Sequence, residues 1–329
     1  MLGLCCMLGY ALQPLAAYPQ TASAVAGESK TVATPAPTAR QSQDDAWWTG
    51  PMLANSAATL PRGHFLIEPY LYDASSARTD SFGSLTYMLY GLTDRLTVGL
   101  IPVFGYNRVS GGPDSSGVGL GDVSVQAQYR LIQAEQGSSL PTISLQLQQT
   151  LPSGRHDRLG RASDGFGSGA RTTTVQLNTQ TYFWLPRGRI VRVRFNVARS
   201  FSTPADVEGA SVYGTAAGFR GQARPGRSVF VNAAWEYSLS RRWVLALDLT
   251  YRRDQGTQVS GYDAVPPGDT RPPTRIRRNT GSSEAFGFAP AIEYSWSANL
   301  GMLLGVRVIT GGHGTTRSVT PAVALNYVH

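Results

Sequence analysis

Hydrophobic and polar positions alternate with a period of two along most of the chain after residue 63. In the clearest stretch, residues 243–252, one set of alternate positions holds Trp243, Leu245, Leu247, Leu249 and Tyr251. The other set holds Val244, Ala246, Asp248, Thr250 and Arg252. Successive side chains of a strand point to opposite faces, so this stretch predicts a β-strand with one wholly apolar face. An aromatic residue at each end of that face is typical of a membrane-spanning strand.

The same alternation predicts twelve strands, at about residues 63–72, 83–92, 95–106, 121–131, 142–151, 172–185, 189–199, 229–239, 243–252, 285–296, 300–309 and 318–328. The connections that follow the even-numbered strands are short or moderate, whereas most of the others are long and rich in Gly, Pro, Asp or Arg. Short turns at one end and long loops at the other are typical of bacterial outer-membrane barrels. A soluble β-sandwich, the alternative, has no need for loops that alternate in length. We therefore predict an all-β fold, a transmembrane antiparallel up-and-down barrel of about twelve strands over residues 63–329.

The segment before the barrel has no such period. Residues 1–24 are uncharged, apolar at first and small at their end, and we interpret them as a secretory signal peptide. These residues lack the basic N-terminal region of a typical signal peptide. A buried helix is the alternative interpretation. Residues 25–62 predict a periplasmic segment, partly disordered, because Ala, Thr, Ser, Pro and Gln dominate them. The apolar run 47–51 could plug or line the barrel mouth or cap its end, and we favour the cap.

Composition narrows the choice of partners. The chain has 329 residues, of which 42% are hydrophobic and 15% charged, and a net charge of +8. Almost all the positive charge is Arg, scattered through turns and loops without a nucleic-acid-binding motif. Arg pairs bidentately with phosphate, so we expect contact with outer-membrane lipid and lipopolysaccharide rather than with nucleic acid. The candidates for lipopolysaccharide contact stand in the longest loop: Arg271, Arg275, Arg277 and Arg278.

If the apolar rows face lipid, the charged residues of the other rows face the lumen, because charge on the lipid face is costly. These lumen candidates are Glu68, Asp122, Arg130, Arg192, Arg194, Glu236, Asp248, Arg252, Glu293 and Arg307. Two roles are open for them: a network that braces a narrow barrel, or rings of charge that line a solute path. The pair Arg192 and Arg194 is the best candidate for contact with an anion.

Nothing in the sequence indicates an enzyme, a metal or a cofactor. Both cysteines, Cys5 and Cys6, lie in the predicted signal peptide, which leaves the remaining chain without disulfides or thiol nucleophiles. The Asp, Glu and His residues have no metal-ligand spacing, and no Ser–His pair of an outer-membrane hydrolase stands out. The glycine-rich run 117–122 lacks the helix that follows a phosphate loop.

Several turn and strand motifs suggest a family. They are Gly-Leu-Thr-Asp-Arg-Leu-Thr-Val-Gly at 91–99, Gly-Leu-Gly-Asp-Val-Ser at 119–124, Tyr-Arg-Leu at 129–131, Leu-Pro-Ser-Gly-Arg at 151–155, Glu-Tyr-Ser at 236–238 and the closing strand 319–327. From about residue 63 to its end the chain resembles the bacterial outer-membrane barrels grouped under the meta-cleavage pathway of phenol degradation. The resemblance implies an outer-membrane channel for small hydrophobic or aromatic compounds, without catalytic residues. The alternative is a closed structural or adhesion-type barrel whose external loops bind a partner.

Overall fold

The computed structural model describes residues 40–134, 140–263 and 272–329, which belong to one compact unit. The predicted signal peptide, residues 25–39 and Arg271 lie outside the described residues. No helix in these ranges is long and apolar enough to cross a membrane.

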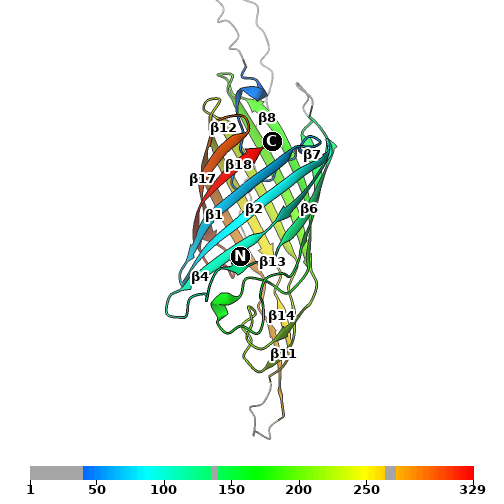
Figure 1. Cartoon of the computed structure of the whole chain (residues 1–329), viewed down its shortest axis with the longest axis vertical. Helices are drawn as coiled ribbons and strands as arrows, with labels where there is room; N and C mark the ends of the chain where they lie inside the picture. The colour runs from blue at the N-terminus through cyan, green and yellow to red at the C-terminus, as the bar shows by residue number, and fades with distance from the viewer. Residues whose placement is uncertain (1–39, 135–139, 264–271) are drawn as a thin grey trace, which may run out of the picture. The chain divides into compact units, whose positions relative to one another are not determined.

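The unit is a closed antiparallel β-barrel (Figure 1). Its wall contains β1 (Phe65–Ser76), β2 (Thr79–Thr93), β3 (Leu96–Ile101), β4 (Val103–Val109), β5 (Gly119–Leu120), β6 (Ser124–Ile132), β7 (Thr142–Thr150), β8 (Thr172–Trp184), β9 (Ile190–Ser202), β12 (Ser228–Ser238), β13 (Trp243–Asp254), β16 (Ser283–Ser295), β17 (Leu300–Gly311) and β18 (Ser318–Val328). Pro102, which has no N–H to donate, separates β3 from β4, and both pair with β2. Likewise β5 and β6 pair with β4 and β3 and form one interrupted strand. With β1 paired to both β18 and β2, the wall closes as twelve strands, and the predicted fold is confirmed.

The alternation along β13 sets its two faces as predicted. Trp243, Leu245, Leu247 and Leu249 are between 38% and 46% exposed on the outside, whereas Val244 and Asp248 are 0% exposed. Aromatic rings lie near both ends of the outer face. Trp243 packs on Tyr294 with ring centroids 4.6 Å apart, and Tyr251 packs on Phe286 at 4.9 Å. This outer surface matches the apolar band and aromatic girdles of a membrane-embedded barrel.

The two ends of the barrel differ. β1 begins and β18 ends at the same end, with Leu66 opposite Val328, and the connections there are short; we call it the short-turn end. At the other, long-loop end, β7 is joined to β8, and β13 to β16, by long segments. One loop predicted there is absent, because β1 and β2 extend until only residues 77–78 separate them.

Two segments predicted as loops contain a second sheet at the long-loop end (Figure 1). It consists of β10 (Ala205–Glu208), β11 (Phe219–Arg224), β14 (Gln258–Asp263) and β15 (Thr274–Asn279), and we call it the external sheet. Phe219, Ala223 and Val259 are buried on one of its faces. The opposite face carries Arg220 and Tyr262 opposite each other in the ladder.

Candidate functional site in the barrel interior

The inner wall of the barrel has a polar half on β6 to β9. Its side-chain amides join into a network across neighbouring strands. Gln146 donates to Gln126 at 2.9 Å, and Asn196 donates to Asn178 at 2.8 Å. Asn178 in turn donates to Gln128 at 3.2 Å. Because each amide both donates and accepts, this half of the wall offers hydrogen bonds of both kinds to whatever lies inside.

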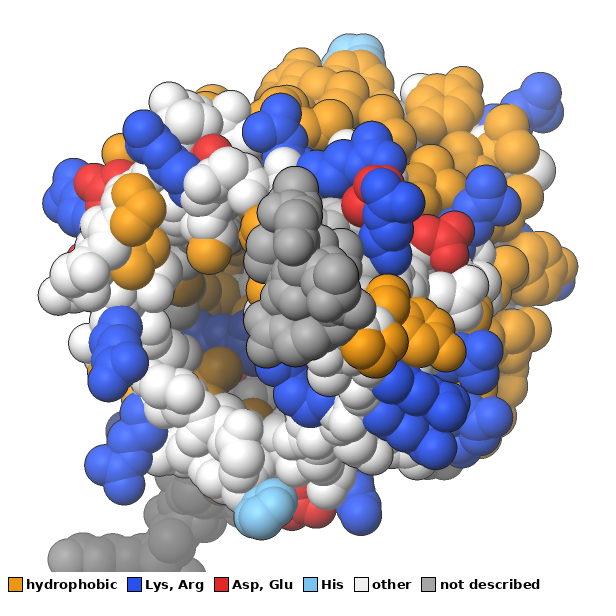
Figure 2. Space-filling model, turned by 90° about the horizontal axis from the view of Figure 1, so that it is seen from below, with side chains coloured by type: hydrophobic (Ala, Val, Ile, Leu, Met, Phe, Trp, Pro, Cys, Tyr) orange, Lys and Arg blue, Asp and Glu red, His pale blue; other side chains and the backbone are white. Residues whose placement is uncertain are grey.

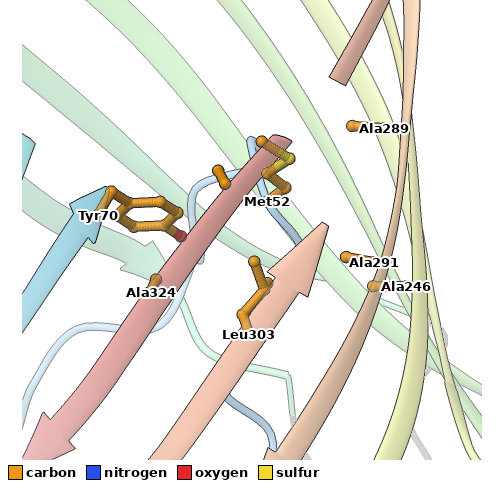
Figure 3. Packing of buried hydrophobic residues seen from close by; sticks show 8 residues of the cluster. Met52, Tyr70, Ala246, Ala289, Ala291, Leu303 and Ala324 are labelled. Atoms are coloured by element: carbon orange, nitrogen blue, oxygen red, sulfur yellow. The ribbon is translucent and has the colours of Figure 1, made fainter. Parts of the chain in front are cut away.

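The inner wall on β1, β13 and β16 to β18 carries an apolar cluster beside its few charged residues. The buried residues of this cluster are Tyr70, Ala246, Ala289, Ala291, Leu303, Ala322 and Ala324 (Figure 3). Most of these side chains are small, which leaves room for a chain segment inside the barrel. The lumen is therefore two-sided, with amides facing methyl groups and aromatic rings.

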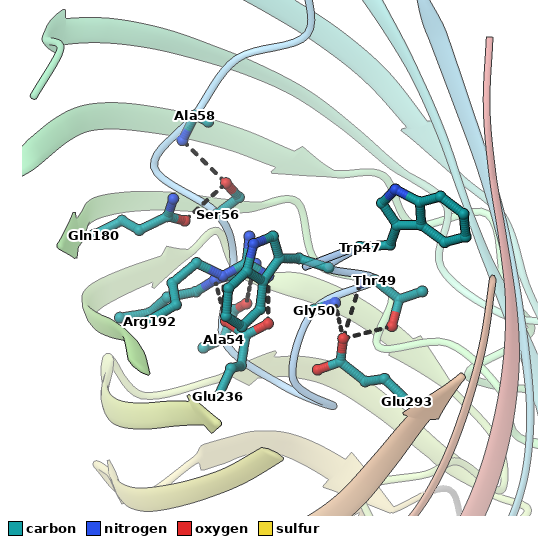
Figure 4. A network of polar contacts seen from close by, with 12 residues as sticks. Trp47, Thr49, Gly50, Ala54, Ser56, Ala58, Gln180, Arg192, Glu236 and Glu293 are labelled. Carbon is teal, nitrogen blue, oxygen red and sulfur yellow. Dashed lines mark hydrogen bonds and ion pairs between the residues drawn. The ribbon is translucent and has the colours of Figure 1, made fainter. Parts of the chain in front are cut away.

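Residues 40–62, which we call the inner segment, occupy this lumen. Gln41 N donates to Gly188 O at 2.8 Å, and Gly63 N donates to Gly91 O at 2.9 Å, so the segment enters and leaves at the short-turn end. Between these points it bends into the barrel interior (Figure 4). The sequence favoured a cap over the barrel end for residues 47–51. The structure instead has the segment lining the lumen.

Two buried carboxylates hold the backbone of the inner segment. Glu293 Oε2 accepts hydrogen bonds from Thr49 N at 2.9 Å, Thr49 Oγ1 at 2.8 Å and Gly50 N at 3.1 Å (Figure 4). Asp248 accepts from Ala54 N at 3.0 Å and from Leu53 N at 3.2 Å. Bonds to a charged acceptor are stronger than those between neutral groups, so these carboxylates anchor the segment.

The rest of the segment follows the two halves of the wall. On the polar side, Asn55 donates to Gln146 at 3.1 Å, and Gln128 donates to Ala58 O at 3.1 Å. On the apolar side, Met52 packs among Ala291 and its neighbours (Figure 3). The segment thus matches the chemistry of each half of the wall.

Glycines in β17 make room for the segment. A Cβ at Gly301 would lie 2.2 Å from Cγ2 of Thr49, and one at Gly305 would lie 3.2 Å from Sδ of Met52. The first distance is far inside van der Waals contact. Gly301 therefore permits Thr49 to approach the wall.

An arginine–glutamate cluster lies beside the segment. Arg192 stands directly opposite Glu236 in the β9–β12 ladder, and its guanidinium donates to both carboxylate oxygens. Arg194 Nε lies 3.1 Å from Glu236, and Arg194 Nη1 donates to Ala54 O at 2.8 Å. The guanidinium of Arg192 also lies 4.6 Å from the ring centre of Trp48. Both arginines thus have partners within the protein, and both also line a cavity beside the inner segment.

A cavity of about 240 Å³ remains between the inner segment and the wall. From the barrel wall it is lined by Glu68, Tyr70, Tyr87, Gln126 and Val328, and from the inner segment by Leu60. The Glu68 carboxylate accepts a hydrogen bond from Asn326 at 3.2 Å. The cavity therefore combines aromatic rings with polar groups.

The connection between β7 and β8, residues 151–171, folds across the long-loop end, and we call it the mouth loop. Asp122 accepts from Gly154 N at 3.0 Å and from Ser168 N at 2.7 Å. The ring of Phe166 lies against Gly105 and Gly119, where added Cβ atoms would be 3.0 and 2.1 Å from it. Asp122, expected from the sequence in the lumen, ties this loop to the wall. Seen from this end, the molecule has a hollow with basic and hydrophobic side chains at its floor (Figure 2).

The other charged candidates lie apart from the inner segment. Arg252 donates to Asp254 at 2.8 Å near the long-loop end. Arg307 lies on the inner face, and its Nε is buried without a hydrogen-bond partner among the described residues. Arg130, on the inner face near the short-turn end, is half-buried.

Of the loop arginines, Arg275 and Arg277 are exposed on the same face of the external sheet as Tyr262. The guanidinium of Arg278 instead donates to the carbonyl oxygens of Tyr213 and Gly214. Arg278 is therefore committed to a contact within the protein.

Comparison with known proteins assigns a family. The family model described as "Putative MetA-pathway of phenol degradation" matches residues 50–327. The chain belongs to this family. The match begins inside the inner segment, so the family pattern includes part of it as well as the barrel. Comparison with curated protein sequences gave no match.

Of three similar solved structures, one has a TM-score above 0.5 and supports the fold. An outer membrane channel from Pseudomonas putida F1 is 14% identical, with a TM-score of 0.60 over 84% of this chain and all of the other. The NanC porin is 8% identical, with a TM-score of 0.43 over 79% of this chain and 98% of the other. The β domain of the Bordetella autotransporter BrkA is 10% identical, with a TM-score of 0.45 over 82% of this chain and all of the other. The closed barrel and its apolar outer belt place the protein in the bacterial outer membrane, as the sequence predicted.

Proposed function

We propose that the protein is an outer-membrane channel through which small compounds diffuse, and that the inner segment must leave its place for the lumen to open fully. The observation that carries this proposal is the position of the segment, which lies in a lumen whose wall combines hydrogen-bonding and apolar groups. A cavity of about 240 Å³ also remains between the segment and the wall, so the segment does not fill the lumen completely.

The proposed solute is a small compound with one aromatic ring and a polar substituent. An apolar protein cavity of roughly 150 Å³ holds benzene, so the cavity of about 240 Å³ beside the segment has room for such a ring. Tyr70, Tyr87 and Leu89 would contact the ring, and Gln126 or Gln128 would bond to the substituent. The family description, which refers to phenol degradation, supports the same class of compound.

Liposome swelling and planar-bilayer conductance of the purified protein test the proposal. The Asp248→Asn/Glu293→Gln variant weakens the two anchors of the segment while it keeps side-chain size. We expect phenol to enter liposomes that contain the wild-type protein, and to enter faster with the variant. Glu284→Gln, which changes a half-buried carboxylate outside the lumen, is the control and should match the wild type. A wild-type protein impermeable to every small solute would contradict the proposal.

One observation favours the second candidate, an adhesion-type barrel. The external sheet presents Tyr262, 54% exposed, between Arg220 and Arg275 in the ladder. An exposed aromatic ring between two guanidinium groups is suited to bind a partner. That candidate predicts that a strain without the protein keeps its phenol uptake but loses surface binding.

A further inference from the structure

Three arginines gather on the outer surface of the barrel near the long-loop end, and we call them the rim arginines: Arg199, Arg227 and Arg253. All three are exposed. Val229 on β12 pairs with Arg199 on β9 on one side and with Arg253 on β13 on the other. Arg227 comes directly before β12, two residues from Val229, and its guanidinium lies near Phe201 as that of Arg199 does. β9, β13 and the residue before β12 therefore bring three guanidinium groups together on the outer surface.

The rim arginines lie at the edge of the apolar belt. On β13, Arg253 follows directly on the outward row that ends with Tyr251. The guanidinium groups of Arg199 and Arg227 lie 5.4 and 5.6 Å from the ring centre of Phe201, which is 40% exposed. A charged residue on the lipid face costs about 2–4 kcal/mol at the bilayer midplane but little at the interface. This position therefore suits a cation in contact with lipid headgroups.

The cluster has surplus positive charge. Glu284 Oε1 lies 3.5 Å from Arg253 Nε, and this is the one ion pair of the rim arginines within the described residues. Among the described residues, three arginines against one glutamate leave two positive charges without an ion-pair partner. Guanidinium groups match phosphate oxygens in geometry and bind them bidentately.

We propose that the rim arginines and Phe201 form a binding site for a phosphate group of lipid A in the outer leaflet. In outer-membrane barrels the long loops face outward, so this edge of the belt lies at the depth of the lipid A sugars. The arginines would bind the phosphate, while Phe201 packs against the lipid beside it. This site differs from the loop arginines that the sequence indicated, because Arg275 and Arg277 lie on the external sheet beyond the belt.

Native mass spectrometry of the purified full-length protein in detergent tests the site. The probes are diphosphorylated lipid A, lipid A stripped of its phosphates, and inorganic phosphate. The test variant is Arg199→Gln/Arg227→Gln/Arg253→Gln, and the matched control is Arg275→Gln/Arg277→Gln. Heat-shifted migration in gels shows whether each variant forms the barrel. If the triple variant fails to fold, Arg199→Gln and Arg227→Gln alone replace it, and each should weaken binding at least twofold.

We expect the triple variant to bind diphosphorylated lipid A at least tenfold more weakly than the wild type, and the control variant to bind it normally. Lipid A without phosphates should bind wild type and triple variant equally weakly. Unchanged binding by the triple variant, or an equal loss in the control, would overturn the proposal. Inorganic phosphate that displaces lipid A at equal concentration would overturn the assignment to a lipid.

Discussion

At the scale of single residues, several charged groups inside the barrel contact one another or the inner segment. Glu236 is 0% exposed and faces both Arg192 and Arg194, so removal of its charge leaves two buried cations without their partner. Loss of one partner of a buried ion pair typically costs about 3–5 kcal/mol. The same cluster also contacts the inner segment, because Arg194 donates a hydrogen bond to Ala54 O.

We predict that Glu236→Gln lowers barrel stability by about 3 kcal/mol or more, for that reason. The measurement is urea unfolding in lipid vesicles, followed by tryptophan fluorescence. Glu284→Gln breaks an exposed pair with Arg253 and should cost less than about 1 kcal/mol. Equal losses in the two variants would show that the cluster does not brace the barrel.

A second prediction concerns Gly301. In Gly301→Ala, the new methyl group would lie 2.2 Å from Thr49 Cγ2 and push the inner segment from the wall. We expect higher single-channel conductance than in the wild type. Thr49→Ser removes Cγ2 but keeps the hydroxyl bonded to Glu293, so the double variant should regain wild-type conductance. Failure of this rescue would contradict the assigned contact.

At the scale of elements, the mouth loop is fastened by acidic residues outside the apolar belt. Ser116 N and Ser116 Oγ donate to Asp164 at 2.7 and 3.0 Å, and these bonds lower the pKa of Asp164 below its ordinary value of 3.8. A carboxylate with a lowered pKa contributes stability above its ordinary pKa and loses that contribution as pH falls through the lowered value. The loop is therefore fastened at neutral pH and released only in strong acid.

We predict that hydrogen exchange in the mouth loop, corrected for intrinsic rates, quickens as pH falls below about 3.8. Asp164→Asn should remove this pH dependence, because its amide does not titrate. The measurement is exchange followed by mass spectrometry between about pH 2.5 and pH 6. Exchange that speeds up equally in the variant would assign the effect to other groups.

Asp122 gives a further prediction for the same loop. Asp122→Ala removes the acceptor of Gly154 N and Ser168 N and leaves both donors unpaired. We expect trypsin to cut after Arg155, Arg158 or Arg161 about tenfold faster in intact cells, since the loss of such bonds costs about 1.5–3 kcal/mol. Asp206→Asn, on the exposed face of the external sheet, is the control and should leave the rate unchanged. A wild-type rate in Asp122→Ala would show that other contacts fasten the loop.

At the scale of the whole molecule, the barrel could be predicted from the sequence because lipid makes the alternation strict. Asp248 had to face inward, since its neighbours Leu247 and Leu249 form the lipid face. The partner of Asp248 in the inner segment could not be predicted. It is the backbone of Leu53 and Ala54, whose segment has no period that would show where it lies.

The external sheet was not predicted either, because its strands also lack a clear alternation of apolar and polar residues. Its strands are four to six residues long, and Gly221 and Gly261 stand opposite each other where apolar side chains would mark a buried face. Phe219 fills that space, as Cβ atoms at the two glycines would lie 2.8 and 2.7 Å from its ring. Short strands packed on one ring carry too little alternation to be told from loops.

The most direct test of the central claim, that the inner segment moves to open the lumen, is to lock it in place. Thr49→Cys/Gly301→Cys brings two thiols within disulfide range, because Thr49 Cγ2 lies 2.2 Å from the Cβ position of residue 301. Each single cysteine variant is a control. We predict that the oxidised double variant conducts less than the wild type in planar bilayers and admits phenol into liposomes more slowly, and that reduction restores both. Equal conductance and phenol entry in the oxidised and reduced states, with the disulfide verified by mass spectrometry, would contradict the account.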